Sequence, residues 1–245
     1  MAHLFGIIGR PLGHSFSARY FGEKFAAEGL DDHSYSKFEL SDISELPALV
    51  ASHPDLRGFN VTIPYKQQVI PLLDALSPEA ERIGAVNCVK VENGRLTGYN
   101  TDALGFRNSL LELLGEERPA ALVLGTGGAS KAVKYILAQE GIDFLNVSRT
   151  PGPDAIAYRD LDRQTVQSHP LIVNATPLGT YPAVEGCPDL PYRFIGPRHR
   201  LFDLVYNPPL TAFLARGRER GARIMNGSRM LIDQAEKSWE IWNAR

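Results

Sequence analysis

The stretch AALVLGTGGASKAVKYIL, residues 120–137, decides the fold of this chain. Its apolar beginning predicts a buried strand, its glycines predict a tight turn, and the residues after them predict a helix. In such a unit, glycines let the backbone approach a pyrophosphate, which the N–H groups at the helix N-terminus then bind. Ser130 occupies the place of the third glycine of the G-x-G-x-x-G pattern. Taken alone, the stretch is equally compatible with an ordinary structural turn.

A regular alternation of strands and helices surrounds this unit. Apolar runs that predict strands and amphipathic runs that predict helices follow one another at residues 120–124, 129–139, 144–147, 171–174, 201–205, 210–216 and 222–225. Such alternation is typical of parallel strands joined by crossover helices. The sequence therefore predicts an α/β protein with a Rossmann-like parallel sheet in this part of the chain.

The chain before residue 102 has a different pattern. Strands are predicted at 4–8, 35–40, 58–63, 85–91 and 95–99, and helices at 17–27 and 43–52. Asn93-Gly94 between the last two strands is a strong signal for a two-residue hairpin, so this sheet contains antiparallel as well as parallel strands. We expect two lobes, with their boundary at a helix predicted over 103–114. The long amphipathic helix at 227–242 is expected to return to the first lobe, which gives one domain at 1–101 with 226–245 and a second at 102–225.

Composition excludes several classes of protein. The 245 residues carry 26 Lys and Arg against 28 Asp and Glu, a net charge of −2, without a long run of like charges. A polyanion-binding surface is therefore not expected, which argues against a nucleic-acid partner. Cys88 and Cys187 lack C-x-x-C spacing, so we expect neither a zinc site nor a disulfide framework. No apolar run reaches bilayer length or resembles a signal segment, and we expect a cytoplasmic protein without a membrane or metal partner.

The expected end of the second Rossmann strand suggests which dinucleotide binds. In this fold an Asp or Glu at that position binds the adenosine ribose, whereas an arginine suits a 2′-phosphate. The sequence there is Ser148-Arg149-Thr150, with no carboxylate. Arg149 therefore favours NADP, and the alternative is a solvated surface arginine.

A lysine follows the third strand predicted in the first lobe, in Asn60-Val61-Thr62-Ile63-Pro64-Tyr65-Lys66. Pro64 suits a first helical position, which would put Lys66 in the first turn of a helix. The helix dipole disfavours a cation there by about 0.3–1 kcal/mol, which suits proton transfer. The alternative is an ordinary surface lysine.

Two further polar clusters each allow a structural and a functional interpretation. Asp102 precedes the helix expected from Ala103, and is either its N-cap or a carboxylate directed at a ligand. Ser15 and Ser17, in His14-Ser15-Phe16-Ser17, either cap the next helix or bind a carboxylate at its N-terminus. His14 is expected at most to shape this loop.

These segments together resemble one family in order and spacing over nearly the whole chain, the shikimate dehydrogenases. The matching segments are His14–Ser17, Asn60–Lys66, Gly84–Asn87, Gly98–Asp102, Gly125–Ala129, Asn174–Gly179, Asp203–Pro208, and Asn226-Gly227 with Met230, Leu231 and Gln234. The combination is highly specific, although each segment alone is weak.

The resemblance implies a role for each matching position. Lys66 and Asp102 would be the catalytic pair, and Ser15 and Ser17 would hold the substrate carboxylate. The other implied substrate residues are Thr62, Asn87, Tyr206 and Gln234. The implied NADP-binding residues are Gly125, Thr126, Gly127, Gly128 and Ala129 with Ser148, Arg149, Thr150 and Thr176. The domain at 1–101 with 226–245 would then bind substrate and carry catalysis, and the domain at 102–225 would bind NADP.

The implied reaction is the reversible reduction of 3-dehydroshikimate to shikimate with NADPH, in chorismate and aromatic amino acid biosynthesis. The implied partner is a small-molecule substrate, and a monomer and a homodimer are both compatible with the sequence. The chain departs from the family's pattern after Arg149, where the second basic residue often found is missing. Two alternatives remain: a quinate/shikimate dehydrogenase that uses NAD, and a non-catalytic ligand-binding regulator on the same scaffold.

Overall fold

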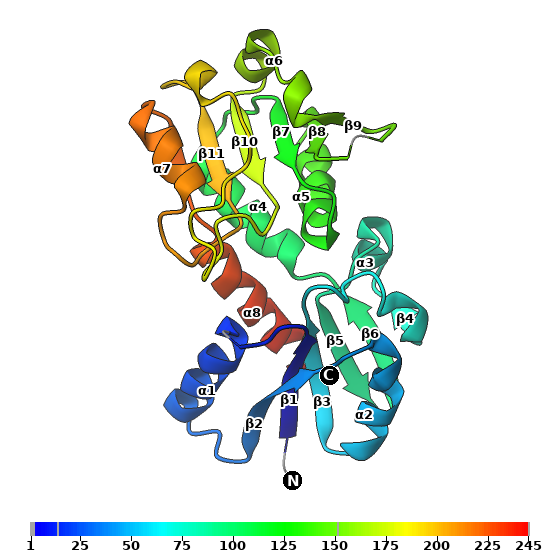
Figure 1. The fold of residues 1–245 in the computed structure, drawn as a ribbon. Helices are drawn as coiled ribbons and strands as arrows, with labels where there is room; N and C mark the ends of the chain where they lie inside the picture. Colours follow the sequence, from blue (N-terminus) through cyan, green and yellow to red (C-terminus); the bar gives the residue numbers. More distant parts are fainter. Residues whose placement is uncertain (1–2, 14, 151, 245) are drawn as a thin grey trace. The chain divides into compact units, whose positions relative to one another are not determined.

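The computed structural model describes residues 3–13, 15–150 and 152–244, and these form two compact units. The first unit is Met1–Thr101 with Ala235–Arg245, and the second is Asp102–Gln234. Each contains its own six-stranded sheet (Figure 1). One helix, α8 (Ser228–Asn243), is shared by both, because the unit boundary falls within it.

The first unit has a mixed sheet in the order β2-β1-β3-β5-β6-β4. β1 is parallel to both β2 and β3, whereas β5 is antiparallel to β3 and β6. The predicted hairpin is present, with Asn93 at φ 53° and Gly94 at φ 78° between β5 and β6. The elements are β1 (His3–Gly9), α1 (Phe16–Glu28), β2 (His33–Glu39), a 3₁₀ helix (Ile43–Glu45), α2 (Leu46–Ser52), β3 (Leu56–Val61), a second 3₁₀ helix (Ile70–Leu72), β4 (Ala75–Leu76), α3 (Pro78–Ile83), β5 (Cys88–Glu92) and β6 (Arg95–Tyr99).

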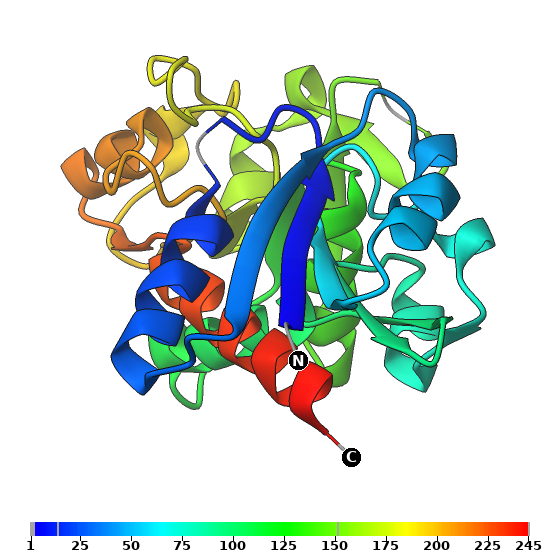
Figure 2. The ribbon, with the colours of Figure 1, turned by 90° about the horizontal axis from the view of Figure 1, so that it is seen from below.

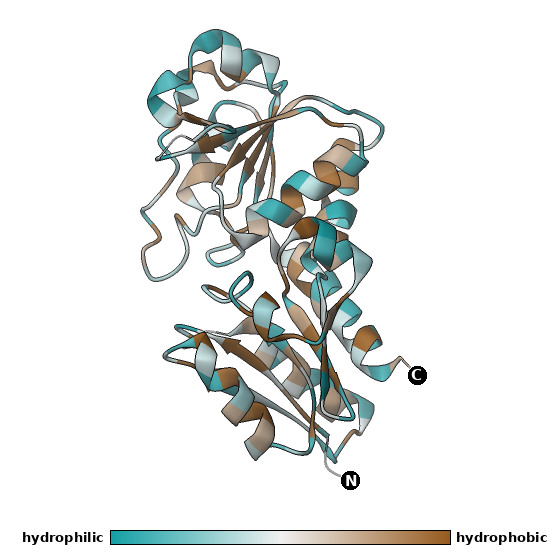
Figure 3. Ribbon diagram, turned by 90° about the vertical axis from the view of Figure 1, so that its right-hand side faces the viewer, coloured by the Kyte–Doolittle hydropathy of each residue, from teal (hydrophilic) through white to brown (hydrophobic). Residues whose placement is uncertain are grey.

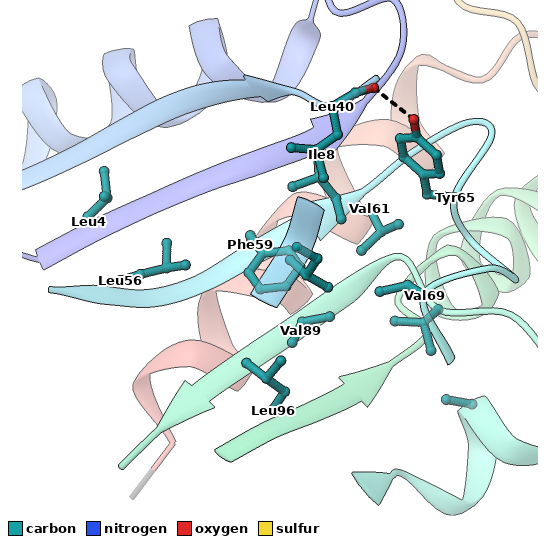
Figure 4. Packing of buried hydrophobic residues seen from close by; sticks show 13 residues of the cluster. Leu4, Ile8, Leu40, Leu56, Phe59, Val61, Tyr65, Val69, Val89 and Leu96 are labelled. Atoms are coloured by element: carbon teal, nitrogen blue, oxygen red, sulfur yellow. Dashed lines mark hydrogen bonds between the residues drawn. The ribbon is translucent and has the colours of Figure 1, made fainter. Parts of the chain in front are cut away.

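Helices cover both faces of this sheet. Alternate strand residues point to opposite sides, and in β1 the residues on both sides are apolar and need to be buried. Leu4 and Ile8 of β1 pack in a core that includes Leu46 of α2 (Figure 4). Phe5, between them, packs instead with α1 and with Trp242 of α8. Figure 2 shows α1 and α2 on opposite sides of the strands. The end of α8 therefore packs onto the first unit, as the sequence predicted.

The second unit has the expected parallel sheet, in the order β12-β11-β10-β7-β8-β9. Numbered along the chain this is 6-5-4-1-2-3, the doubly wound Rossmann order, so the predicted fold class is confirmed. Its strands are the most apolar part of the unit (Figure 3). The elements are α4 (Asp102–Leu114), β7 (Ala121–Leu124), α5 (Gly128–Gln139), β8 (Phe144–Ser148), β9 (Ala155–Ala157), a 3₁₀ helix (Tyr158–Asp160), α6 (Arg163–Ser168), β10 (Leu171–Asn174), a 3₁₀ helix (Tyr192–Phe194), β11 (Arg200–Asp203), α7 (Ala212–Glu219) and β12 (Arg223–Met225).

The structure corrects one local prediction. Residues 63–69 form consecutive turns that lead into the 3₁₀ helix Ile70–Leu72, so Lys66 does not lie in the first turn of an α-helix. Tyr65 and Val69 are both buried in the core of the first unit. Burying these two side chains holds the segment close to the sheet, and the helix that Pro64 suggested does not form.

Candidate active site

The segment that carries Lys66 is held at the carboxyl end of β3. The Thr62 amide donates to the carbonyl of Ile8 at 2.9 Å, and the Tyr65 hydroxyl donates to the carbonyl of Leu40 at 2.7 Å (Figure 4). The Lys66 carbonyl accepts a hydrogen bond from the Val86 amide at 2.7 Å. The backbone of Lys66 is therefore anchored by its own carbonyl and by the side chain before it.

The strand directions bring the predicted substrate residues of the first unit to this same edge. β1 and β3 are parallel, so the segment after β1, with Ser15 and Ser17, lies at the edge that carries Thr62 and Lys66. β5 is antiparallel to β3 and β6 is antiparallel to β5, so the start of β5 and the end of β6 also reach it. Asn87 precedes β5, and Asn100, Thr101 and Asp102 follow β6. His14 lies outside the described residues.

The two serines differ in their contacts. Ser15 is the N-cap of α1, and its Oγ accepts from the amide of Ala18 at 3.4 Å. The Ser17 side chain is buried near the phenol of Tyr35, where it counteracts part of the increase that burial causes in the pKa of that phenol. The structure therefore confirms the capping interpretation for Ser15. A cap that accepts through its oxygen retains its own O–H, so this contact leaves the carboxylate-binding prediction open.

Asn87 and Thr101 are bound to each other inside the first unit. The Asn87 Oδ1 accepts from the Thr101 amide at 2.6 Å, and its Nδ2 donates to the Thr101 Oγ1 at 2.9 Å. Both residues are almost completely buried. Asp102, which follows directly, is 6% exposed and is the first residue of α4. The amide of Asn87 thus has a fixed orientation, and the backbone that leads into Asp102 is anchored.

In the second unit, the glycine turn between β7 and α5 requires glycine at its first position. Gly125 has φ 109°, and a Cβ there would lie 3.0 Å from the Cγ2 of Thr176. The Ser130 hydroxyl donates to the Gly125 carbonyl at 2.7 Å. With its amide nitrogen facing the carbonyl oxygens, Asn146 donates to the Gly125 and Val123 carbonyls at 3.0 Å. Ser130, in the place of the third glycine, therefore closes the turn.

The N-terminus of α5 suits a dinucleotide phosphate. Gly127 is the N-cap, no side chain caps the helix, and a Cβ on Gly127 would meet no atom within 4 Å. The first N–H groups of a helix lack partners within the helix, and they attract an anion together with the dipole. Gly128 begins α5 and Thr126 lies inside the turn, so residues 125–129 have the geometry on which the predicted pyrophosphate site depends.

Arg149 follows the last residue of β8, in the place expected for contact with the ribose. Its side chain is exposed, and it lies close enough to Tyr158 for its charge to affect that phenol. Burial raises the pKa of Tyr158 to about 12, and the positive charge of Arg149 counteracts part of this increase. The Thr150 amide donates to the Ser148 Oγ at 3.3 Å, which makes a compact turn around Arg149.

Thr176 is held by a buried polar network at the carboxyl ends of β10 and β11. Asn174 accepts from the Thr176 hydroxyl at 2.6 Å and donates to the Asp203 carboxylate at 2.9 Å. Asp203 also accepts from the Val205 amide at 3.0 Å and from the Thr211 hydroxyl at 2.5 Å. Burial raises the pKa of Asp203 to about 6, although these three donors favour its charged form. The network joins the segment after β10 to the segment after β11.

Tyr206 and Gln234 belong to the second unit by their contacts. Tyr206 lies in the segment after β11 that Asp203 anchors through Val205. Gln234 is 6% exposed in α8, and its Nε2 donates to the carbonyl of Leu231 at 2.8 Å. The predicted substrate residues are therefore divided between the two units, and Asp102 begins the second.

The sequence analysis did not predict the residues that support these positions, namely Asn146, Asn174, Asp203 and Thr211. A signal was present, because Asn146, Asn174 and Asp203 are polar residues within or at the ends of strands that are otherwise apolar. A buried polar side chain needs a partner, so such residues indicate a hydrogen-bond network at a strand end. Among the described residues, no group of His, Cys, Asp or Glu could hold a metal ion, and no helix is long and apolar enough to cross a membrane.

Known proteins match this chain over nearly its whole length. Residues 7–89 match the model of the shikimate dehydrogenase substrate-binding domain. The shikimate dehydrogenase (NADP(+)) of Moorella thermoacetica is 38% identical, and the alignment covers 99% of this chain and 88% of the relative.

Two solved structures extend the match to the fold. The shikimate 5-dehydrogenase of Thermus thermophilus, in complex with NADP(H) and shikimate, has a TM-score of 0.86 and 33% identity, over 98% of this chain and 93% of that one. The enzyme of Listeria monocytogenes, in complex with shikimate and NAD, has a TM-score of 0.85 and 31% identity, over 100% and 92%. The resemblance read from the motifs is confirmed: the chain belongs to the shikimate dehydrogenase family.

Proposed function

We propose that this chain catalyses the NADPH-dependent reversible reduction of 3-dehydroshikimate to shikimate, a step in chorismate and aromatic amino acid biosynthesis. The observation that carries the proposal is the strand order of the first sheet, whose directions lead the segments with Ser15, Ser17, Thr62, Lys66 and Asn87 to one edge. Membership of a family whose curated relatives are named shikimate dehydrogenase (NADP(+)) supports the choice of substrate and cofactor.

Lys66 is the proton donor in this proposal. NADPH, when bound, supplies a hydride to the ring carbonyl carbon of the substrate. Negative charge then grows on the carbonyl oxygen, and a donor within hydrogen-bond reach must supply a proton to it. The ammonium of Lys66 suits this task because its backbone is anchored at the edge where the substrate residues lie.

Asp102 is proposed to orient Lys66 and a substrate hydroxyl. A carboxylate that accepts hydrogen bonds from both groups fixes their distance and direction, and loss of such positioning can cost orders of magnitude in rate. The anchoring of Thr101 by Asn87 supports this role, because it restricts the backbone immediately before Asp102.

The remaining groups of the site bind the substrate without reacting. Ser15 and Ser17 hold its carboxylate, at the N-terminus of α1 where an anion is favoured. Thr62, Asn87, Tyr206 and Gln234 contact its ring hydroxyls or carboxylate. The proposed division of labour is that 1–101 with 226–245 bind the substrate and carry catalysis, and 102–225 bind NADP.

The second unit binds NADP through its glycine turn and the end of β8. Gly125, Thr126, Gly127, Gly128 and Ala129 accommodate the pyrophosphate, and Thr176 packs beside Gly125. Arg149, with the hydroxyls of Ser148 and Thr150, contacts the 2′-phosphate. An arginine there, without a carboxylate, favours NADP over NAD.

A direct assay tests the proposal and its two rivals. Oxidation of NADPH and of NADH is followed separately with 3-dehydroshikimate, and reduction of NADP with shikimate and with quinate. The proposal predicts turnover of 3-dehydroshikimate with a preference for NADPH. Preference for NADH together with turnover of quinate would support the NAD-dependent rival, and ligand binding without turnover would support a regulator.

The cellular setting is part of the same proposal. We place the protein in the cytoplasm, as a monomer or a homodimer, with small molecules and no nucleic acid as its ligands. Cys88 and Cys187 are free thiols, which suits a reducing compartment. Fractionation of cells and light scattering of the purified protein measure the location and the oligomeric state.

A further inference from the structure

A chain of buried hydrogen bonds crosses the first unit between residues with proposed substrate roles. The Tyr35 hydroxyl donates to the Asn60 Oδ1 at 2.7 Å. The Asn60 Nδ2 then donates to the Ser238 Oγ at 3.0 Å and to the Asn87 carbonyl at 3.2 Å. Asn60 is 4% exposed and Ser238 is completely buried. None of these three residues, Tyr35, Asn60 and Ser238, has a role in the proposed reaction.

Both ends of this chain reach groups of the proposed site. At one end, Ser17 lies near the Tyr35 phenol: burial holds the pKa of this phenol well above its ordinary value, and Ser17 counteracts part of the increase. At the other end, the Ser238 Oγ lies 3.3 Å from the Thr101 Oγ1, which is bound to Asn87.

The amide of Asn60 sets the direction of the whole chain. Its oxygen accepts from Tyr35, and its nitrogen donates to two acceptors, so rotating the amide would break all three bonds. Because the Tyr35 proton goes to Asn60, the phenol oxygen is left as an acceptor. Asn60 lies in β3 and Ser238 lies in α8, so elements far apart in the sequence fix these orientations together.

We propose that Tyr35, Asn60 and Ser238 are positioning residues that hold Asn87 and Thr101 in the orientations needed for substrate binding. The inference rests on the proposed function, since the oriented side chains are those proposed to support binding of 3-dehydroshikimate. It goes beyond that function because the three residues act through others and touch no reacting atom.

The network consists of neutral groups. The titratable groups that belong to it or contact it are the phenol of Tyr35 and the thiol of Cys88, which hydrogen-bonds to Ser238. Burial raises the pKa of Cys88 to about 12 and holds that of Tyr35 well above its ordinary value. Both remain protonated near neutral pH, so the network positions its neighbours without responding to pH in this range.

The first test removes a single oxygen atom. Tyr35→Phe is expected to raise KM for 3-dehydroshikimate about 3- to 10-fold, while KM for NADPH stays within about twofold and kcat within about threefold. The matched control is Tyr192→Phe, which removes a phenol oxygen bound to the Pro188 carbonyl at 3.0 Å in the second unit. The control is expected to leave both KM values unchanged.

A double-mutant cycle tests whether the residues act as one chain. Ser238→Ala is expected to raise KM for 3-dehydroshikimate in the wild-type background and to have a smaller effect after Tyr35→Phe, because the connection through Asn60 is already broken. Effects that multiply independently would overturn the proposal, as would an unchanged KM in both single variants or an equal rise in KM for NADPH. If Tyr35→Phe does not fold, Ser238→Ala alone carries the test. Wild-type enzyme without turnover would overturn the proposed function and this inference with it, whereas active wild type with unchanged variants would overturn only the inference.

Discussion

The two sheets end in buried polar networks of different kinds. In the first unit the network around Asn60 consists of amides and hydroxyls, and the proposed reacting cation, Lys66, belongs to a separately anchored segment. In the second unit the network centres on the carboxyl group of Asp203, which accepts three hydrogen bonds. One edge is therefore held by neutral groups and the other by a titratable one.

The two networks differ in charge because they have different tasks: one orients side chains near the substrate, and the other joins two backbone segments. A neutral network fixes directions without adding a charge beside the substrate, so it does not compete with Lys66 for the developing negative charge. A buried carboxylate can gather several donors from different segments, and Asp203 in this way joins the segments after β10 and β11. We therefore expect the contribution of the Asp203 network to stability to depend on pH, and the Asn60 network to be insensitive to pH near neutrality.

The largest effect is expected from the reacting group itself. Lys66→Ala is expected to lower kcat about 10²- to 10⁴-fold with a smaller change in KM, because a proton donor acts mainly in the transition state. Steady-state kinetics with 3-dehydroshikimate and NADPH measure the effect. Lys237→Ala, which removes a half-exposed lysine paired with Glu240, is the control and should keep normal turnover. Near-normal kcat in Lys66→Ala would rule out the assigned role.

The Asp203 network of the second unit is expected to make the free energy of unfolding depend on pH. The pKa of Asp203 is about 6 in the folded protein and about 3.8 in an unfolded chain, so the folded state binds the proton more tightly. The stabilisation that protonated Asp203 contributes is fully present below the pKa of the unfolded chain. It is lost as the pH rises through the pKa of the folded protein, and this loss lowers the free energy of unfolding by up to about 3 kcal/mol. The difference in unfolding free energy between wild type and Asp203→Asn should fall accordingly between about pH 3.5 and 7.

Urea unfolding across this pH range measures that difference. Asp143→Asn, at an exposed position of the same unit, controls for the loss of one carboxyl group. A difference between wild type and Asp203→Asn that stays constant with pH would show that Asp203 does not titrate in this range. The contrast between the two networks would then be one of geometry alone.

Replacing Arg149 is expected to change the preference for NADPH over NADH by a smaller factor than replacing Lys66 changes kcat. A charge-assisted contact between Arg149 and the 2′-phosphate is worth about 1.5–3 kcal/mol, which corresponds to about 10- to 150-fold in preference for NADPH. Arg149→Ala should bring the ratio of kcat/KM for NADPH over NADH towards unity, chiefly by weakening the use of NADPH. Arg163→Ala, an exposed arginine in the same unit, is the charge control. If Arg149→Ala keeps the full preference for NADPH, Arg149 is not the residue that distinguishes NADPH from NADH.

Local patterns predicted the architecture because each strand and helix leaves a short periodic signal. The glycine turn at 125–129, the Asn93-Gly94 hairpin and the alternation after residue 120 all formed as expected. The short elements β4, α3, β9 and α6 were not predicted, and elements of two to six residues leave at most a weak periodic signal. The turns at Lys66 also depend on burial of Tyr65 and Val69, which is a tertiary effect.

The site residues were accessible through motifs, whereas the pairing of these residues with their supports was not. Asn87 and Asn174 lie in motifs other than those of their partners Thr101 and Asp203, which are 14 and 29 residues away in the sequence. The contact between Asn60 and Ser238 spans 178 residues. Hydrogen bonds of such separation leave no local pattern, so only the folded structure shows which polar residues support the site.

The smallest expected effect is the difference in KM for 3-dehydroshikimate between variants of Ser15 and Ser17, the two serines of the first unit. The Ser15 Oγ accepts from the Ala18 amide, a contact that does not use its own hydrogen, whereas Ser17 is buried near the Tyr35 phenol oxygen, to which we expect it to donate its hydrogen. Ser17 must turn this hydrogen away from Tyr35 to bind a carboxylate, so it contributes less net binding free energy than Ser15. Ser15→Ala should raise KM for 3-dehydroshikimate about 5- to 20-fold and Ser17→Ala about 2- to 5-fold, with KM for NADPH unchanged in both and in the double variant. Ser15→Ala also removes the cap of α1, at about 1 kcal/mol of stability, so thermal unfolding is measured beside the kinetics. A larger effect at Ser17 than at Ser15 would show that Tyr35 does not hold the Ser17 hydrogen when the substrate binds.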